Sequence, residues 1–371
     1  VNTKRPLKIL EDELAALGCR KILMPDKGQF GLTQLSRIPW DATDGKNESG
    51  FRRRRITYEA DVPANIVQTS GSSGRPKAVV LSVGNHYYSG LGSNRHIPMT
   101  GHDAWLVSLP VYHVSGVSIL WRSFLAGAAV VLGGPKRDIS ACLRQFPVTH
   151  LSLVPVQLQS LLQQHRLEDR LKKLKAVLLG GSSVPPELVR SAIRKKIPVF
   201  ASYGLTEMSS QVATTVRIRH MKALTQARVL PYRKIQISDA DEICVCGKTL
   251  CLGFMKRRKV HTVVDSGGWY HTGDRGRLNK EGRLEVWGRL DLMFVSGGEN
   301  IYPEEIERAL LSLPEVAAAV VVPMACATFG WRPTASVQFH RGARLTPAQL
   351  RNGLSSRLEK YKIPDVFYHW P

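Results

Sequence analysis

A regular alternation of short apolar runs with helical stretches extends from about Asn65 to Phe200. Six runs rich in β-branched residues end in glycine, serine or proline: IVQTS, AWLVSLP, AAVVLGG, HLSLVP, KAVLLGG and IPVFASYG. Two of the segments between them, Val156 to Leu162 and Pro186 to Lys195, have apolar residues at helical spacing. This order is typical of an α/β fold with a parallel sheet, in which ligands bind at the loops after the strands.

The C-terminal part of the chain has a different pattern. After the shorter runs KIQIS and EICVC, the strand-like runs RLEVWG, LMFVSGG, VAAAVVVP and TASVQF surround two helices that begin near Pro303 and Thr346. Proline and acidic residues are favoured in the first turn of a helix, and both occur after Tyr302. We therefore predict a large layered α/β domain over residues 1–288 and a small α+β domain over residues 289–371.

Length and composition agree with two globular domains. The chain has 371 residues, 43% of them hydrophobic and 22% charged, which argues against disorder, a collagen-like repeat or a coiled coil. The longest apolar region, Val114 to Leu132, is interrupted by polar residues and glycines and therefore fails as a membrane span. No apolar run follows the first charges, so no secretory signal is indicated, and a cytoplasmic location is predicted.

The chain is strongly basic. Its 52 lysines and arginines against 30 acidic residues give a net charge of +22, most of it within residues 101–280. The two dense clusters, Arg52–Arg55 and Lys256–Lys259, contain no interleaved aromatic residues, so a basic surface that attracts anionic ligands is favoured over nucleic-acid binding. The six cysteines form no CxxC pair, and this favours reduced thiols over a zinc knuckle or a disulfide framework.

The most specific segment is TSGSSGRPKAV, which directly follows a predicted strand. Its glycines and hydroxyl side chains supply many donors for a polyphosphate. The spacing differs from that of a Walker P-loop, and Ala78 stands where a magnesium-binding serine or threonine would be. The candidate phosphate-binding residues are Thr69, Ser70, Gly71, Ser72, Ser73, Gly74 and Lys77.

This loop resembles the phosphate-binding signature of the acyl-adenylate-forming enzymes, which include acyl-CoA ligases, luciferases and peptide-synthetase adenylation domains. Five further segments resemble signatures of that family and occur in its order: SLPVYHVSG, LLGGSSVPPEL, YGLTE, YHTGDRG and GRLDLMFVSGGENIYPEEIE. The resemblance extends over almost the whole chain. It implies that ATP activates a carboxylic acid as an acyl-adenylate and that a thiol, here CoA, then takes the acyl group.

The resemblance also implies a role for individual residues. Thr206 would hydrogen-bond the α-phosphate, and Glu207 would coordinate Mg²⁺, which takes oxygen ligands. His113 would border the carboxylate pocket, although a lone histidine near an apolar strand can also be a core residue. Asp274 would bind the ribose hydroxyls together with Arg289. The adenine would be bound by Tyr203, Gly180, Gly181 and Gly204.

The same resemblance assigns the second half of the reaction to the small domain. Asp291 would be the hinge about which this domain turns between the two half-reactions. Ser296, Gly297 and Gly298 would line the tunnel for the pantetheine arm of CoA. ATP, Mg²⁺ and CoA are therefore the expected ligands, and the oligomeric state is left open, a homodimer included.

Within the family, the chain is most similar to the o-succinylbenzoate-CoA ligases of menaquinone biosynthesis. Arg122 could be a counter-ion for the second carboxylate of that substrate, but a helix-surface arginine is the favoured interpretation. Two alternatives stay open: a ligase for another benzoate, a fatty acid or an amino acid, and a non-catalytic basic protein that binds a nucleotide or nucleic acid.

The chain departs from the family pattern at both ends. Val1-Asn2 aligns inside the family's first subdomain, and Pro371 precedes the GK-containing loop whose lysine stabilises the charge that develops during adenylation. We therefore expect a large domain incomplete at its start and a small domain incomplete at its end. We also expect impaired adenylation by this chain, either as a fragment of a longer ligase or as a natural remnant.

Overall fold

The structure is a computed structural model that describes residues 21–24, 36–39, 59–69, 77–133 and 138–370. Its largest unit is a sheet of eleven strands in the order β12-β13-β16-β17-β11-β10-β9-β8-β7-β5-β6. The five strands at one end, β6, β5, β7, β8 and β9, are parallel, and the pairs from β9 to β12 that follow them are antiparallel. The fold is mixed α/β, as the sequence predicts.

The parallel strands coincide with five of the six predicted runs. Their bounds are β5 (Ala104–Leu106), β6 (Ala129–Val131), β7 (His150–Leu153), β8 (Ala176–Leu179) and β9 (Val199–Leu205). All four residues of β8 are buried: Val177 and Leu179 pack into one hydrophobic cluster, and Ala176 and Leu178 into another on the opposite face. Helices therefore cover both faces of this part of the sheet, which explains its continuous apolar runs.

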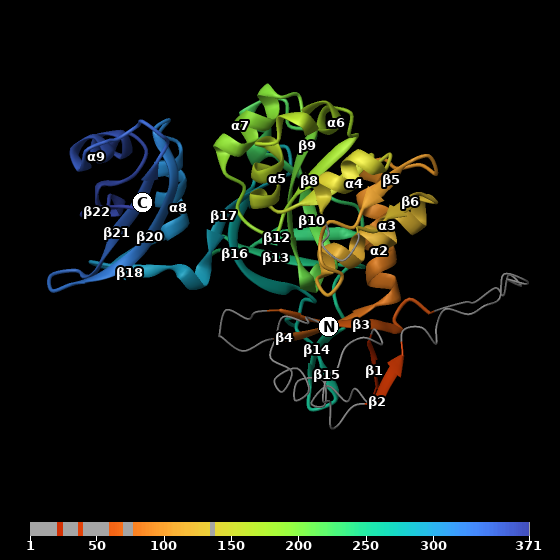
Figure 1. Cartoon of the computed structure of the whole chain (residues 1–371). Coiled ribbons are helices and arrows are strands. Elements are labelled where there is room, and N and C mark those ends of the chain that lie inside the picture. Colours follow the sequence, from red (N-terminus) through yellow and green to blue (C-terminus); the bar gives the residue numbers. More distant parts are fainter. Residues whose placement is uncertain (1–20, 25–35, 40–58, 70–76, 134–137, 371) are drawn as a thin grey trace, which may run out of the picture.

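Helices connect these strands (Figure 1). They are α2 (Val83–His96), α3 (Val114–Ala126), α4 (Ile139–Gln145), α5 (Pro155–Leu162), α6 (Glu168–Lys172) and α7 (Pro186–Arg194). The predicted helices Val156 to Leu162 and Pro186 to Lys195 correspond closely to α5 and α7. Residues on α4, α5 and α7 pack with β7, β8 and β9 into the first hydrophobic cluster. Among the described helices, none combines the length and apolarity needed to cross a membrane.

One predicted strand lies elsewhere. The run IVQTS belongs to β3 (Pro63–Thr69), which pairs antiparallel with β4 (Lys77–Ser82) in a separate sheet of order β15-β14-β4-β3. Its expected place in the parallel alternation is therefore wrong. Only seven residues separate β3 from β4, and so short a connection permits an antiparallel hairpin, whereas a parallel pair requires a longer crossover.

The remaining strands of the large sheet and of this second sheet pair antiparallel with one another. They are β10 (Ser210–Thr214), β11 (Ala227–Val229), β12 (Arg233–Ile237), β13 (Glu242–Gly247), β14 (Gly253–Lys256), β15 (Lys259–His261), β16 (Tyr270–Leu278) and β17 (Arg283–Arg289). A further pair, β1 (Lys21–Met24) and β2 (Ser36–Pro39), is parallel. The 3₁₀ helices are η2 (His165–Leu167), η3 (Thr206–Met208), η4 (Met221–Thr225), η5 (Leu290–Leu292) and η6 (Lys360–Lys362).

The C-terminal elements form a separate α+β unit with its own core. Its strands are β18 (Phe294–Ser296), β19 (Glu299–Ile301), β20 (Val316–Cys326), β21 (Gly330–Phe339) and β22 (Val366–His369), and its helices are α8 (Pro303–Leu311) and α9 (Pro347–Ser355). The buried residues of this unit, among them Ile306, Leu310 and Leu354, pack with one another. In Figure 1 these blue elements gather beside the large sheet, and β17 of that sheet leads toward them.

Candidate functional site

The motifs predicted to bind nucleotide meet at the carboxyl ends of β8 and β9. Gly180 and Gly181 directly follow β8, Tyr203 and Gly204 lie near the end of β9, and η3 then carries Thr206. Because β8 and β9 are parallel neighbours, these residues come to the same edge of the sheet. The sheet topology therefore places the LLGG and YGLTE segments side by side.

A hydrogen-bonded chain links YGLTE to the two later motifs. The hydroxyl of Tyr203 donates to Oδ2 of Asp274 at 2.6 Å, and Nη1 of Arg289 donates to Oδ1 of the same carboxylate at 3.0 Å. Burial raises the pKa of the Asp274 carboxyl, although Tyr203 and Arg289 both act to lower it. Burial and the neighbouring Asp274 also raise the pKa of Tyr203 well above its usual value. The structure thus brings together three residues that are separated in sequence.

Arg289 occupies the end of β17, where the large sheet passes into the C-terminal unit. Its Nε and Nη2 each donate to an oxygen of Asp291 at 2.9 Å, while Nη1 also donates to the carbonyl of Thr272 at 3.0 Å. The backbone N–H of Arg289 donates to Oε1 of Glu304 at 3.2 Å. The predicted hinge residue and the predicted ribose residue are therefore joined through one guanidinium group.

Glu207 is nearly buried, with 8% of its surface exposed. Its Oε1 accepts a hydrogen bond from the hydroxyl of Tyr270 at 3.0 Å, and its carbonyl accepts one from the N–H of Cys251 at 2.7 Å. Burial followed by the Glu207 charge raises the pKa of Tyr270, so this hydroxyl stays a donor. Tyr270 begins the segment YHTGDRG, but no role was predicted for it from the sequence.

Two glycines of the site meet specific backbone requirements. Gly181 has a φ of +84°, in the left-handed region that favours glycine. At Gly204 a Cβ would collide with the carbonyl oxygen of Ser210, because β9 and β10 approach closely there. The conformation and the packing of the backbone require glycine at both positions, independently of any ligand.

The predicted phosphate loop is described only at its two ends. Thr69 ends β3 and is the register partner of Lys77, which begins β4. The Nζ of Lys77 lies 5.5 Å from the ring centre of Phe254. Ser70, Gly71, Ser72, Ser73 and Gly74 lie outside the described residues.

The favoured interpretation of Arg122 as a helix-surface arginine is wrong. The side chain lies on the inner face of α3 and has 1% of its surface exposed. Its Nη2 donates to Oγ of Ser210 at 3.3 Å, its guanidinium lies 5.2 Å from the ring centre of Trp105, and its Nε has no hydrogen-bond partner. Arg122 shares this buried face of α3 with Ser118 and Ile119, and the sequence of the helix alone did not identify which of its faces is buried.

The buried guanidinium of Arg122 also has no anionic partner within the described part of the chain. Burial lowers its pKa to about 9. Arg233, also buried, adds a second positive charge nearby, but its guanidinium is occupied by the carbonyls of Gln211 and Pro231 and by the hydroxyl of Ser89. The interior next to YGLTE is therefore positively charged.

His113 is the residue before α3, and its ring is exposed. Its ring packs edge-on against that of Tyr112, with 4.8 Å between the ring centres, and partial burial of the imidazole lowers the pKa of His113. His113 therefore caps the start of α3, and Arg122 lies near the other end of the same helix. The core interpretation of His113 does not fit this exposure.

The predicted CoA residues lie where β18 passes into β19: Ser296 ends β18, and Gly297 and Gly298 connect the two strands. Ser296 is 3% exposed, and Gly297 and Gly298 both have positive φ angles, +58° and +89°. The N–H of Gly297 donates to the carbonyl of Phe329 at 2.9 Å. These residues belong to the C-terminal unit, whereas Tyr203 and Asp274 lie on β9 and β16 of the large sheet.

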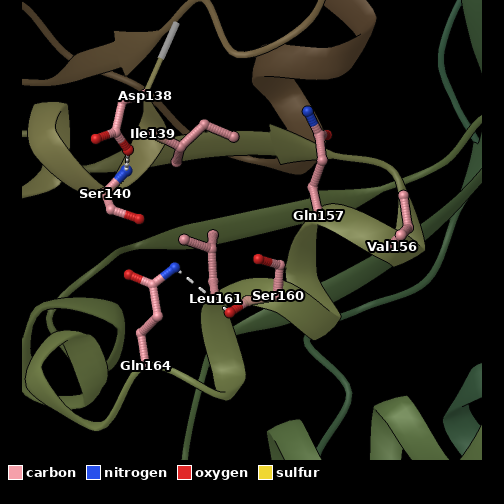
Figure 2. A pocket seen from close by; sticks show the side chains of 8 residues that line it. All are labelled: Asp138, Ile139, Ser140, Val156, Gln157, Ser160, Leu161 and Gln164. Atoms are coloured by element: carbon pink, nitrogen blue, oxygen red, sulfur yellow. Dashed lines mark hydrogen bonds between the residues drawn. The ribbon is translucent and has the colours of Figure 1, made fainter.

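A pocket on the large unit contains none of the predicted site residues. Figure 2 shows it between the start of α4, with Asp138 and Ser140, and the side of α5, with Gln157 and Ser160. The N–H of Ser140 donates to Oδ1 of Asp138 at 2.9 Å, an ordinary N-cap. The pocket is a depression between two helix surfaces.

The chain was compared with protein families and with individual proteins. The model of the family "AMP-binding enzyme" matches residues 19–254, and that of the "AMP-binding enzyme C-terminal domain" matches residues 305–370. The 2-succinylbenzoate–CoA ligase of Escherichia coli strain K12 is 36% identical over 365 residues, which are 98% of this chain and 75% of that protein. That of Bacillus cereus strain Q1 is 34% identical over 338 residues, 87% of this chain and 69% of that protein.

Solved structures agree with these matches. The o-succinylbenzoate CoA synthetase of Bacillus subtilis in complex with the acyl-adenylate intermediate OSB-AMP has a TM-score of 0.82 and 31% identity, over 100% of this chain and 78% of that one. The same enzyme in complex with ATP and a magnesium ion has a TM-score of 0.81 and 31% identity, over 100% and 79%. From the family matches and these similarities, we conclude that the chain belongs to the AMP-binding enzyme family.

Proposed function

We propose that this protein is an ATP-dependent ligase that activates 2-succinylbenzoate as an acyl-adenylate and transfers the acyl group to CoA. The relatives at 34% and 36% identity carry this activity in their names, and the similar Bacillus subtilis structures hold OSB-AMP and ATP with magnesium. The observation in this chain that supports the acid's identity is Arg122, a buried guanidinium that no described carboxylate neutralises.

The nucleotide would lie at the carboxyl ends of β8 and β9. The Tyr203 ring offers an apolar face for adenine, and the hydroxyl of this residue is held by Asp274. Gly180, Gly181 and Gly204 keep side chains away from the base. The Asp274 carboxylate, held by Arg289, would accept hydrogen bonds from the ribose hydroxyls.

Glu207 is suited to coordinate a magnesium ion. Mg²⁺ takes carboxylate and phosphate oxygens, and the carboxylate of Glu207 is nearly buried and fixed through Oε1 by Tyr270. The ion supplies positive charge that neutralises the phosphates of ATP. Thr206, which precedes Glu207, would hydrogen-bond the α-phosphate together with Thr69 and Lys77 at the ends of the phosphate loop.

The reaction has two transfers. A carboxylate oxygen of the acid attacks the α-phosphorus, the bond to the β-phosphate bridging oxygen breaks, and pyrophosphate leaves. The thiol sulfur of CoA then attacks the acyl carbon, its proton passes to solvent, and AMP leaves with the electron pair of the C–O bond. The impaired adenylation expected from the sequence stays a prediction, which the rate of pyrophosphate exchange tests.

The second carboxylate of the acid would meet Arg122. A charge buried without an anion is unfavourable, and a ligand carboxylate at this place would satisfy the free Nε and pair with the guanidinium. Arg122 lies beside Ser210, three residues after Glu207, so the acid would lie next to the phosphates. His113, at the start of the same helix, would border the other end of the acid pocket.

The test measures binding, so it does not depend on turnover. Arg122→Met is expected to bind a non-hydrolysable 2-succinylbenzoyl-adenylate analogue at least tenfold more weakly than the unchanged protein in calorimetric titration, since a charge-assisted bidentate contact is lost. Binding of the matching benzoyl-adenylate analogue, which lacks the second carboxylate, is expected to stay the same.

An equal loss for both analogues would instead show that Arg122 only supports the fold. A panel of acids, including other benzoates, fatty acids and amino acids, tests the alternative substrates in the same titration.

For the second half-reaction we propose the domain division 1–288 and 289–371, with Asp291 as the hinge and with Ser296, Gly297 and Gly298 along the path of CoA. The separate core of the C-terminal unit and the bridge from Asp274 through Arg289 to Asp291 support this proposal. We also propose a cytoplasmic location, which agrees with the free thiols of Cys142, Cys244, Cys246, Cys251 and Cys326.

A further inference from the structure

A group of three different metal-ligating side chains lies on β13 and β16, outside the residues assigned above. A carboxylate oxygen of Glu242, Sγ of Cys244 and a ring nitrogen of His271 all lie within 4.8 Å of one another. Nδ1 of His271 is 2.8 Å from Oε2 of Glu242 and 3.5 Å from Sγ of Cys244. The register of the sheet causes this meeting, because Cys244 and His271 are direct partners across the two strands.

Neighbouring groups orient two of these side chains. Nε2 of His271 is 3.2 Å from Oδ2 of Asp265, whose other oxygen accepts the N–H groups of Gly267 and Trp269, each at 2.9 Å. Oε1 of Glu242 accepts the N–H of Gly273 at 2.8 Å. A carboxylate on the far nitrogen of a histidine is a frequent companion of a metal-binding histidine, since it fixes the ring and its tautomer.

The chemistry of the donors selects the metal. A thiolate, an imidazole and a carboxylate are the ligands that Zn²⁺ takes in tetrahedral sites, whereas Mg²⁺ and Ca²⁺ take oxygen alone. Cys244 is 3% exposed, while the side chain of His271 is 51% exposed, so the group opens toward solvent on one side. A water molecule can therefore complete the four ligands.

We propose that Glu242, Cys244 and His271 bind a zinc ion with water as the fourth ligand. Binding replaces the proton of the Cys244 thiol, which passes to solvent. The ion would tie β13 to the start of β16, and Asp274 lies only three residues beyond His271. Because Gly273 already donates to Glu242, the ion would restrain the segment that leads into the nucleotide site.

The experiment uses the full chain with zinc and cobalt salts. After metal removal and equilibrium dialysis, the unchanged protein is expected to retain one zinc per chain, and Co²⁺ is expected to produce the near-ultraviolet absorption of a thiolate ligand. Cys244→Ser and His271→Asn should each lose both signals. Cys246→Ser is the matched control, because Cys246 lies two residues further along the same strand and should retain them.

A variant that perturbs only the supporting carboxylate sharpens the test. Asp265→Asn is expected to weaken zinc binding by about 10- to 100-fold without abolishing it. Zinc is expected to raise the melting temperature of the unchanged protein and of Cys246→Ser, and to leave that of His271→Asn unchanged. His271 is half exposed, so this variant should fold normally even if Cys244→Ser does not.

Three results would overturn the proposal: no bound zinc at micromolar concentration, equal retention by His271→Asn, or loss of the metal from Cys246→Ser to the same degree. None of these measurements involves ATP or an acid. Failure of the zinc site would therefore leave the proposed ligase activity standing, and failure of that activity would leave the zinc site standing.

Discussion

The two carboxylates of the proposed nucleotide site are each held by a tyrosine hydroxyl. Tyr270 donates to Glu207 and Tyr203 donates to Asp274, and both tyrosines have pKa values raised by burial. Because the hydroxyls keep their protons, they remain donors and keep each carboxylate in one orientation. The site is thus preorganised at the level of single hydrogen bonds.

Removing one of these hydroxyls should affect magnesium more than nucleotide. In Tyr270→Phe the carboxylate of Glu207 loses a hydrogen bond worth roughly 1.5–3 kcal/mol for a charged acceptor. We expect the affinity for MgATP to fall about tenfold or more in calorimetric titration, while ATP without magnesium binds as before. Tyr87→Phe, on an exposed tyrosine, is the control. An unchanged affinity for MgATP would contradict the role of Tyr270.

His86 should make the stability depend on pH. The ring is 1% exposed and bonded to Asn65 and Ser209, and burial lowers its pKa from 6.5 to about 4. The unfolded chain therefore takes up this proton at a higher pH than the folded protein does. The contribution of His86 to the free energy of unfolding should therefore fall by about 3 kcal/mol as the pH decreases from about 6.5 to 4, and this contribution should change no further below pH 4.

Urea unfolding at several pH values measures this effect. In His86→Gln the amide keeps hydrogen-bonding capacity but does not titrate, so the slope between pH 6.5 and 4 should decrease by the same amount. A variant with the slope of the unchanged protein would show that other groups cause the acid destabilisation.

At the scale of elements, the close approach of β9 and β10 fixes the site. A Cβ at Gly204 would meet the carbonyl of Ser210, so Gly204→Ala must push the two strands apart. We expect a loss of about 1–3 kcal/mol in the free energy of unfolding and weaker nucleotide binding, since Tyr203 and Thr206 move with the strand.

The control for this change is Gly101→Ala. A Cβ there would make only ordinary contact, at 3.4 Å, with the carbonyl of Gly127. Its free energy of unfolding should stay within about 0.5 kcal/mol of the unchanged protein in the same denaturation assay. If both alanine variants behave alike, the packing argument for Gly204 fails.

At the scale of the whole molecule, the two units have separate cores. The C-terminal core includes Leu310, which is fully buried, and the core beside the parallel strands includes Leu158, also fully buried. Polar contacts join the units: a guanidinium N–H of Arg308 donates to the carbonyl of Trp287, and the guanidinium of Arg275 lies 3.7 Å from the ring centre of Tyr302. The cores should therefore unfold separately.

Calorimetry tests this with a matched pair of cavities. Leu310→Ala should lower the melting temperature of one transition and Leu158→Ala that of the other. Each variant should lose about 2–5 kcal/mol in the free energy of unfolding of its own unit. ATP should stabilise only the transition that Leu158→Ala affects. A single transition that both variants shift equally would show that the two units unfold together.

Local patterns identified much of the fold. The helices near Val156, Pro186 and Pro303 and the last helix after Thr346 lie where their apolar spacing and first-turn residues predict them. The strand IVQTS was recognised as a strand, but its partner was not, because pairing depends on the residues that the chain brings beside it. The six motifs were visible for the same reason as the helices, since each is a short continuous segment.

The sequence by itself determined the family, the order of the motifs and most elements, because these follow from local spacing and from contiguous residues. Only the tertiary structure decided that Arg122 is buried, that Tyr270 holds Glu207, and that Cys244 meets His271. Each of these depends on which face of an element turns inward or on a register between distant strands. Packing and pairing of the whole chain set both, and no single segment encodes them.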